Sequence, residues 1–410
     1  MNKLTLSLAC LVFLAAFTLR FYQVDYPPAP FMDESAHVQA ANHYWQTGQF
    51  EPDHWEHPPL RPIMLHAFLQ VFGDNPYGWR IRNVLFGSLA ALLTFLFALG
   101  IGGSRKTALT AGLLLATDPL HIALSRHTFC EVYSAALFLA AVVLFVWHRQ
   151  RSSWLVLSAI FIGCAMATKW YYFPAWFLLY LLTLHEDNNY RSPGSIAFIT
   201  STYLLIPLSV YTLAFYPWFG RGHSLADFGE FVTNVFSSIQ QYTADNYMEG
   251  LMFLSHLSAG DWFIRPIIVG EGIVGSGSGE FILFSNNLPV WVLTIPSMLA
   301  LLVIAARKKS LQTALPALLF FGSYLMYLFV KRPAFLYSVV PLLPYAFTAI
   351  AFALSRVAER YGARIQYGTL AVILAWNMYL YPLATRKTVP LAPYQYILDS
   401  KDIQIRQKAL

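Results

Sequence analysis

Long apolar runs alternate with short charged loops along almost the whole chain. A bilayer core about 30 Å thick needs about 20 apolar residues in each spanning helix. Runs near that length lie at residues 4–22, 84–101, 107–123, 132–147, 154–168, 171–184, 195–214, 288–306, 311–329, 335–354 and 366–382. The pattern predicts an all-α integral membrane protein with about eleven transmembrane helices.

Two of the connections between these runs are long, 23–83 and 215–287. In the second, residues 225–257 mix apolar side chains with Asp227, Glu230 and Asp245, which is typical of helices that lie on a surface. The apolar runs leave no separate soluble block, so we expect one domain over residues 1–410. We expect both connections to face outward, to carry short surface helices and to cover an active site.

Composition narrows the class of protein. Only 12% of the residues are charged and 57% are hydrophobic, which excludes a water-soluble globule. The net charge of +6 does not indicate nucleic-acid binding, because the basic residues are scattered in small groups between apolar runs. Cys10 and Cys164 lie inside such runs and Cys130 near a helix end, so no disulfide framework is expected.

The short loops predict the orientation in the membrane. Basic groups at 105–106, 148–151, 191, 307–309 and 356–364 fall on one side together with the N-terminus. The positive-inside rule makes that side cytoplasmic. The run from Leu4 to Leu19 offers no small-residue cleavage site and ends at Arg20, so we expect an uncleaved first helix.

Several cations fall on the outer side, against this rule. They are Arg61, Arg80, Arg82, Arg126, Lys169, Arg265, Lys331 and Arg332. Each one alone is explained by snorkelling or by pairing with an outer carboxylate. Together they favour a site for an anion, such as the phosphate of a lipid carrier.

The pair Asp33 and Glu34 is the main candidate for chemistry. It follows the first apolar run after a proline-rich stretch, 27–30, that cannot continue a helix. A carboxylate held at a membrane surface can take a proton from an attacking hydroxyl. Alternatively, Asp33 is the N-cap of a helix, and Glu34 is favourable to the dipole of that helix. Both interpretations can hold at once.

His57 begins a rigid His-Pro-Pro-Leu stretch, 57–60, and can hydrogen-bond a substrate. With His54 and Glu56 it also forms a His-x-x-His spacing, but the prolines argue against both histidines lying on one helical face, so we predict no metal site. The glycine run 275–279 lacks the Lys-Ser or Lys-Thr of a phosphate-binding loop. We interpret it as a hinge or mobile loop.

Charged groups also gather at predicted outer helix ends. They are Ser125-Arg126 with Glu131, Lys169-Trp170, and the stretch from Lys331 and Arg332 to Tyr337. Arginine grips phosphate oxygens bidentately and lysine acts as a point charge, so these residues can bind a phosphorylated donor. The alternative is a structural ion pair of Arg126 with Glu131 or with Asp118.

Taken in order, these motifs resemble the protein O-mannosyltransferase family. The resemblance runs from about residue 25 to 345. It rests on Phe31-x-Asp33-Glu34, His57-Pro58-Pro59-Leu60, Gly78-Trp79-Arg80, Ser125-Arg126 with an acid five residues on, Thr168-Lys169-Trp170 and Arg332-x-x-Phe335-Leu336-Tyr337. The family belongs to the type C glycosyltransferases, which are multi-span enzymes that use a polyprenyl-phosphate sugar on the outer side of the membrane. The resemblance therefore implies that fold.

The resemblance also implies roles. Asp33 is expected to be the catalytic base, with Glu34 supporting it or contacting the acceptor. His57, Arg80, Arg126, Glu131, Lys169, Arg332 and Tyr337 are expected to bind substrate. The donor is expected to be polyprenyl-phosphate mannose or a similar lipid-linked sugar, with no cofactor or metal required. We expect an integral protein of the cytoplasmic membrane of a prokaryote, because the chain has no room for the soluble repeat module of eukaryotic members.

The sequence leaves alternatives open for the acceptor and for the class of function. His256-Leu257-Ser258 departs from the family's His-Pro-Tyr near the acceptor, Glu131 stands where Asp is usual, and Arg61-Pro62 replaces Gly-Lys. These departures keep the identity of the acceptor open. We expect a protein Ser/Thr hydroxyl, and a lipid such as lipid A or a polysaccharide glycan is the alternative. A transporter or flippase for an anionic lipid is the hypothesis from another class, but it would need charges near the bilayer midplane.

Overall fold

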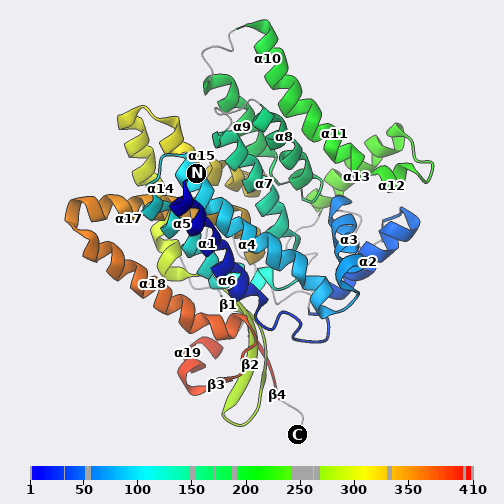
Figure 1. Cartoon of the computed structure of the whole chain (residues 1–410). Coiled ribbons are helices and arrows are strands. Elements are labelled where there is room, and N and C mark those ends of the chain that lie inside the picture. The colour runs from blue at the N-terminus through cyan, green and yellow to red at the C-terminus, as the bar shows by residue number, and fades with distance from the viewer. Residues whose placement is uncertain are drawn as a thin grey trace.

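A computed structural model describes residues 2–31, 33–50, 57–147, 153–169, 171–186, 192–241, 262, 268–329, 335–399 and 403–407. Figure 1 shows a bundle of helices with a small sheet at one end. The helices of the bundle are α1 (Lys3–Phe21), α4 (Pro76–Gly100), α5 (Arg105–Thr117), α6 (Pro119–Ser125), α7 (Cys130–Trp147), α8 (Ser153–Met166), α9 (Phe173–Glu186), α10 (Pro193–Thr200), η2 (Ser201–Leu205), α11 (Ile206–Leu213), α14 (Leu288–Lys308), α15 (Leu311–Tyr324), α16 (Met326–Phe329), η5 (Leu336–Leu342), α17 (Leu343–Tyr361) and α18 (Ala363–Ala384).

Each apolar run of the sequence contains a helix, which confirms the predicted helical membrane class. Among the described residues, six helices are long and apolar enough to cross a bilayer, and a seventh span results if the bent pair α5 and α6 counts as one. The helices at Leu60–Phe72, Ser153–Met166 and Phe173–His185 are apolar but shorter. The predicted count of about eleven spans is therefore not confirmed.

Helix α7 forms the centre of the bundle and α1 lies at its edge. Of the most apolar stretch of 18 residues, 83% is buried in α7, against 28% in α1. A helix that is apolar on every side suits such an interior position. The exposed side of α1 carries Leu4, Leu6, Leu11 and Leu14, which suits contact with lipid.

The break between α5 and α6 comes from a local sequence signal. Pro119 cannot donate to the preceding turn, so α5 ends before it. The carboxylate of Asp118 then caps α6 by accepting from the backbone N–H of His121 at 2.8 Å. The two helices meet at a bend of 57°, and the turn after α6 carries Arg126 and His127 into the site.

The long connections contain the predicted surface helices. The first holds α2 (Glu34–Thr47) and α3 (Leu60–Phe72), and the second holds α12 (Tyr216–Phe219) and α13 (Leu225–Gln241). Aromatic residues join the two groups, because Tyr44 of α2 packs with Phe215 and Trp218. Figure 1 shows α12 and α13 on the same side of the bundle as α2 and α3.

A four-stranded sheet was not predicted. Its order is β3 (Val389–Pro390), β2 (Ser278–Ser285), β1 (Ile268–Val274) and β4 (Ile403–Gln407). Strands β1 and β2 form an antiparallel hairpin, and β4 lies parallel to β1. The short segments η6 (Ala392–Tyr394) and α19 (Gln395–Leu398) lie between β3 and β4.

The interpretation of the glycine run 275–279 as a hinge is wrong, and the mobility of this run stays a prediction. The run is the tight turn of the hairpin, where the N–H of Gly275 donates to the carbonyl of Ser278 at 2.9 Å. Gly277 has φ of +79°, which a glycine adopts without steric cost. Ser278 and Gly279 already belong to β2.

Candidate active site

Asp33 and Glu34 lie where the loop after α1 enters α2. Asp33 occupies the N-cap position of α2, with an exposed side chain that makes no capping hydrogen bond. Glu34 is the first residue of the helix and is only 1% exposed. Neighbours in sequence are thus directed to opposite environments, one to solvent and one to the interior.

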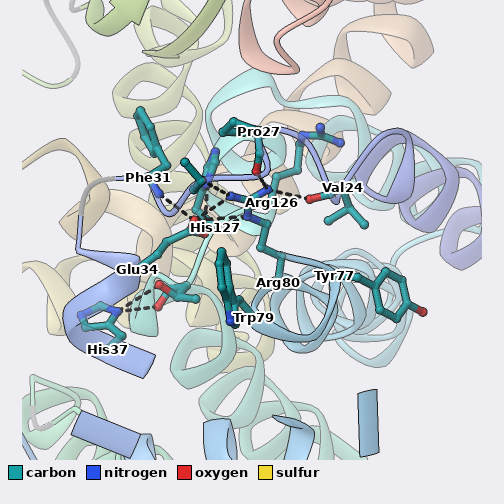
Figure 2. A network of polar contacts seen from close by, with 12 residues as sticks. Val24, Pro27, Phe31, Glu34, His37, Tyr77, Trp79, Arg80, Arg126 and His127 are labelled. Carbon is teal, nitrogen blue, oxygen red and sulfur yellow. Dashed lines mark hydrogen bonds and ion pairs between the residues drawn. The ribbon is translucent and has the colours of Figure 1, made fainter. Parts of the chain in front are cut away.

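Four donors hold the carboxylate of Glu34 (Figure 2). Arg80 of α4 donates from Nε at 3.0 Å to Oε1 and from Nη2 at 2.8 Å to Oε2. His127 lies 3.2 Å away through Nδ1, and the backbone N–H of Phe31 donates at 2.9 Å. A buried carboxylate with this many donors is fixed in place.

Arg80 is fully buried and ties the loop before Asp33 to α4. Besides Glu34, its guanidinium donates to the carbonyls of Val24 at 3.0 Å, Pro27 at 2.9 Å and Ala29 at 3.3 Å. A guanidinium has five N–H groups, and these bonds occupy all of them. The proline-rich loop therefore has a defined shape because Arg80 binds its carbonyls.

The buried pair of Glu34 and His127 has opposing electrostatic influences. Burial alone would raise the pKa of the Glu34 carboxyl, but hydrogen bonds and charge from His127 and Arg80 lower this pKa to about 2. Burial lowers the pKa of His127, and Glu34 opposes that shift. The low pKa of Glu34 favours a charged His127, whereas the low pKa of His127 favours a neutral one. We favour the neutral imidazole, which donates Nδ1–H to an ionised Glu34, because Arg80 already supplies the positive charge.

A narrow pocket opens beside this network. Its empty space is about 150 Å³, which includes space open to solvent. Its lining residues are Phe31, Asp33, Glu34, His37, His127, Thr128 and Phe129. The exposed carboxylate of Asp33 and the imidazole of His37 are thus brought to one pocket with the buried Glu34.

The structure brings three other predicted residues together next to this pocket. Lys169 forms an ion pair with Glu131, and its ammonium lies 5.2 Å from the ring centre of Tyr337. Tyr171 donates to the same carboxylate at 3.2 Å. The ring of Phe129, which lines the pocket, lies 5.7 Å from that of Tyr337.

Arg126 does not pair with Glu131 or Asp118 as the structural alternative supposed. It lies at the end of α1, where Nη1 donates to the carbonyls of Arg20 at 2.9 Å and of Tyr22. Nη2 donates to Gln23 at 3.0 Å and to Thr385 at 3.5 Å. Carbonyls at a helix C-terminus carry partial negative charge, so a cation is favourable there.

The sequence did not predict that two buried cations, Arg61 and Arg82, lie next to each other. Arg82 stacks over the ring of Tyr133 at 4.0 Å and its Nη1 lies 3.5 Å from the carbonyl of Arg61. Arg61 is only 5% exposed, and its Nη1 has no hydrogen-bond partner in the described part of the chain. A buried guanidinium normally has a counter-charge, so Arg61 is a candidate to bind an anionic group.

The remaining predicted residues are placed as follows. His57 is half-buried just before α3. Arg332 lies outside the described residues, as do His54, Glu56, His256 and Trp170. Among the described residues, no three His, Cys, Asp or Glu side chains gather into a metal-binding group.

The loop that leads to Asp33 is also held from the C-terminal part of the chain. The hydroxyl of Tyr26 donates to Glu280 of β2 at 2.9 Å. Arg386, after α18, lies 3.8 Å from the same carboxylate and 5.3 Å from the ring centre of Tyr26. Tyr381 of α18 donates to the carbonyl of Leu19 at 2.9 Å.

Comparison with known sequences gives a family and several relatives. A family model described as dolichyl-phosphate-mannose-protein mannosyltransferase matches residues 10–220. A polyprenol-phosphate-mannose–protein mannosyltransferase of Corynebacterium glutamicum is 21% identical over 72% of this chain and 70% of its own length. An uncharacterized protein of Aquifex aeolicus is 28% identical, and the match covers 41% of this chain but only 35% of that protein.

Two solved structures share the fold. A chain of the Saccharomyces cerevisiae Pmt1-Pmt2 complex bound to its sugar donor matches with a TM-score of 0.79 at 12% identity, over 98% of this chain and 93% of that chain. ArnT of Cupriavidus metallidurans bound to undecaprenyl phosphate matches with a TM-score of 0.61 at 15% identity, over 91% and 63%. These likenesses concern the fold alone and confirm the predicted type C architecture.

Proposed function

Because the chain belongs to the dolichyl-phosphate-mannose-protein mannosyltransferase family, whose model matches residues 10–220, we propose that it is a membrane mannosyltransferase. It transfers mannose with inversion from a polyprenyl-phosphate carrier to a hydroxyl acceptor, with a protein Ser or Thr favoured. The donor and acceptor are those in the name of the Corynebacterium relative. The observation that carries the proposal is the exposed Asp33 beside a fixed, buried Glu34.

Asp33 acts as the general base. The acceptor oxygen forms a bond to the anomeric carbon while the bond from that carbon to the phosphate oxygen breaks. The hydroxyl proton goes to the Asp33 carboxylate, and the electron pair of the broken bond stays on the phosphate. A hydroxyl is a poor nucleophile at neutral pH, and a positioned base typically contributes about 10² to 10⁴ in rate.

Glu34 positions Asp33 and does not take part as a base. Its oxygens are already occupied by Arg80, His127 and the N–H of Phe31, and its lowered pKa makes it a weak base. Holding the first residue of α2 fixes the direction of the preceding residue, which is Asp33.

The leaving phosphate is bound by cations that retain donors for it. Arg80 and Arg126 donate their N–H groups to Glu34 and to backbone carbonyls, so their role is to shape the loop. We assign the phosphate to two cations. Lys169 lies beside Glu131 and Tyr337, and the buried Nη1 of Arg61 has no hydrogen-bond partner among the described residues. His57 and Arg332 remain further candidates. Preorganised cations stabilise the developing charge, so the scheme requires no metal.

The site faces outward from the cytoplasmic membrane of a prokaryote, with the N-terminus in the cytoplasm. Asp33 follows the C-terminal end of α1, which is the end away from the N-terminus. Arg105 begins α5 and Arg307 lies in the last turn of α14. Both arginines belong to the basic groups that define the cytoplasmic side. The connections 23–83 and 215–287 cover the donor and acceptor.

The test is transfer of mannose by purified protein from polyprenyl-phosphate mannose to a Ser/Thr peptide. Asp33→Asn keeps the size of the side chain and removes the base, so we expect kcat to fall by about 10² or more with donor binding retained. Asp399→Asn, another exposed carboxylate, is the matched control and retains activity. Full activity of a folded Asp33→Asn variant contradicts the assignment.

A lipid or glycan acceptor is the second candidate, favoured by the sequence His256-Leu257-Ser258, which departs from the family's His-Pro-Tyr near the acceptor. A lipid acceptor must enter from the bilayer, whereas a peptide enters from solvent. Offering peptide, lipid A and polysaccharide acceptors in parallel separates these cases, because only the true acceptor gains labelled mannose.

A further inference from the structure

The pocket contains a second group that can accept a proton, the imidazole of His37. His37 follows Asp33 by four residues at the start of α2, a spacing that places two side chains on one helix face. Both line the narrow pocket beside Glu34 and His127. His37 is half-buried, so its ring is partly shielded from water.

The contacts of His37 assign its tautomer. Nδ1 lies 3.2 Å from the carbonyl oxygen of Thr128 and 3.1 Å from the hydroxyl of the same residue (Figure 2). A carbonyl oxygen only accepts, so we assign the ring proton to Nδ1. In the neutral ring the basic lone pair is then on Nε2.

We propose that His37 is a second proton-accepting residue of the reaction, an inference that rests on the proposed function. Asp33 receives the hydroxyl proton as the new C–O bond forms and the bond to phosphate breaks. Nε2 of His37 then takes that proton from Asp33, and the imidazolium releases it to water. The carboxylate is thereby restored for the next turnover.

General acidities support the direction of this relay. A carboxyl with an ordinary pKa near 4 gives its proton favourably to an imidazole with an ordinary pKa near 6.5. A base with a pKa near the working pH is also the most effective one. The backbone carbonyl of Thr128 orients the ring, as second partners of catalytic histidines do.

Several other titratable or charged groups lie around His37. Asp33 and Glu34 face it from its own helix, and His127 from the turn between α6 and α7. On the α3 side, His66 is bound to Asn42 at 3.2 Å. Near the end of α2, Arg221 contacts Gln46, and His223 contacts Gln49 just beyond the helix.

The test compares His37→Asn with His43→Asn, a histidine of the same helix that does not line the pocket. Asparagine retains a side-chain N–H near the position of Nδ1, so the contact to Thr128 is kept while Nε2 is lost. We expect kcat of His37→Asn to fall about tenfold or more with both KM values unchanged. The acid limb of its kcat profile moves to lower pH, because the imidazole no longer has to be neutral for turnover.

Two results overturn the role of His37. One is wild-type kcat with an unchanged acid limb in His37→Asn. The other is a loss of activity that comes with raised KM or a lower melting temperature, which indicates a structural role. If wild-type protein transfers no mannose, or if Asp33→Asn stays fully active, the proposed function fails instead, so the two failures are distinguished.

Discussion

The carboxylate of Glu34 collects donors from parts of the chain that are far apart in sequence. Arg80 lies 46 residues away and His127 lies 93 residues away. Breaking a buried ion pair on one side leaves an uncompensated charge and typically costs about 3–5 kcal/mol. The shape of the loop before Asp33 therefore depends on Glu34 as much as on the prolines within it.

Acidification is expected to weaken the fold in two stages. The pKa of His127 is lowered in the folded protein, so its contribution to stability is present above about pH 6.5 and is lost as the pH falls below that value. The pKa of Glu34 is lowered to about 2, so its contribution is present above about pH 4.3 and is lost as the pH falls toward 2. Thermal unfolding across this pH range in detergent measures both stages.

Single variants assign the two stages. His127→Asn should reduce the upper stage, because asparagine does not titrate. Glu34→Gln should reduce the lower stage and lower stability at neutral pH by about 3 kcal/mol. Glu359→Gln removes an exposed pair with Arg356 and should change stability by about 0.5 kcal/mol or less. A Glu34→Gln variant as stable as Glu359→Gln would contradict the central role of Glu34.

At this scale the sequence predicted residue types but not partners. Asp33, Glu34 and Arg80 were all singled out, because carboxylates and cations are conspicuous in an apolar chain. Their pairing depends on how α2, α4 and the turn after α6 meet, which no local pattern contains. His127 was missed for the same reason, since a lone histidine carries no spacing signal.

Among the elements, α4 and α6 approach closely at Gly87. A Cβ at that position would lie 2.8 Å from Cβ of Ser125 and 3.0 Å from Nε of Arg20. Real side chains do not reach such distances without displacing a neighbour. The glycine thus permits the close contact that carries the turn with Arg126 and His127 toward Glu34.

Gly87→Ala is expected to destabilise the protein by about 1–3 kcal/mol, because it overpacks a filled interface. Gly368 of α18 has nothing near the position of an added Cβ, so Gly368→Ala should be neutral or stabilising by up to about 1 kcal/mol. Melting temperatures of the two variants, prepared side by side, make the comparison. Equal melting temperatures would show that the α4 and α6 contact adapts.

The helices were predictable and the sheet was not, for a physical reason. In a bilayer each segment must satisfy its own backbone, so an apolar run of sufficient length becomes a helix whatever surrounds it. Strand β1 pairs with β4 across more than a hundred residues, and such pairing depends on the assembled bundle. The short length of several helices also left the number of spans open.

For the whole molecule, the orientation in the membrane decides which substrates reach Asp33. The hairpin of β1 and β2 lies at the end of the bundle that holds the sheet, as Figure 1 shows. Ser276 lies in its turn, between the end of β1 at Val274 and the start of β2 at Ser278. Lys308 lies at the far end of α14, which starts just after that hairpin. The two positions are therefore expected on opposite sides of the membrane.

Cysteine labelling of intact cells tests this orientation. In a background without the native cysteines, Ser276→Cys should react with a membrane-impermeant maleimide. Lys308→Cys should react only after the membrane is permeabilised. Both positions are exposed, so accessibility within the protein is matched, and the reverse pattern would place the site on the cytoplasmic side.

The contacts of Tyr26 with Glu280 and Arg386 have a consequence for biosynthesis. The loop before Asp33 emerges from the ribosome early, but the residues that hold it, including Thr385 on Arg126, are made hundreds of residues later. The carboxylate of Asp33, the proposed base, is thus expected to reach its final geometry only after the late helices have entered the bilayer. We therefore expect a half-made chain to be inactive and to leave its own newly exported segments unglycosylated.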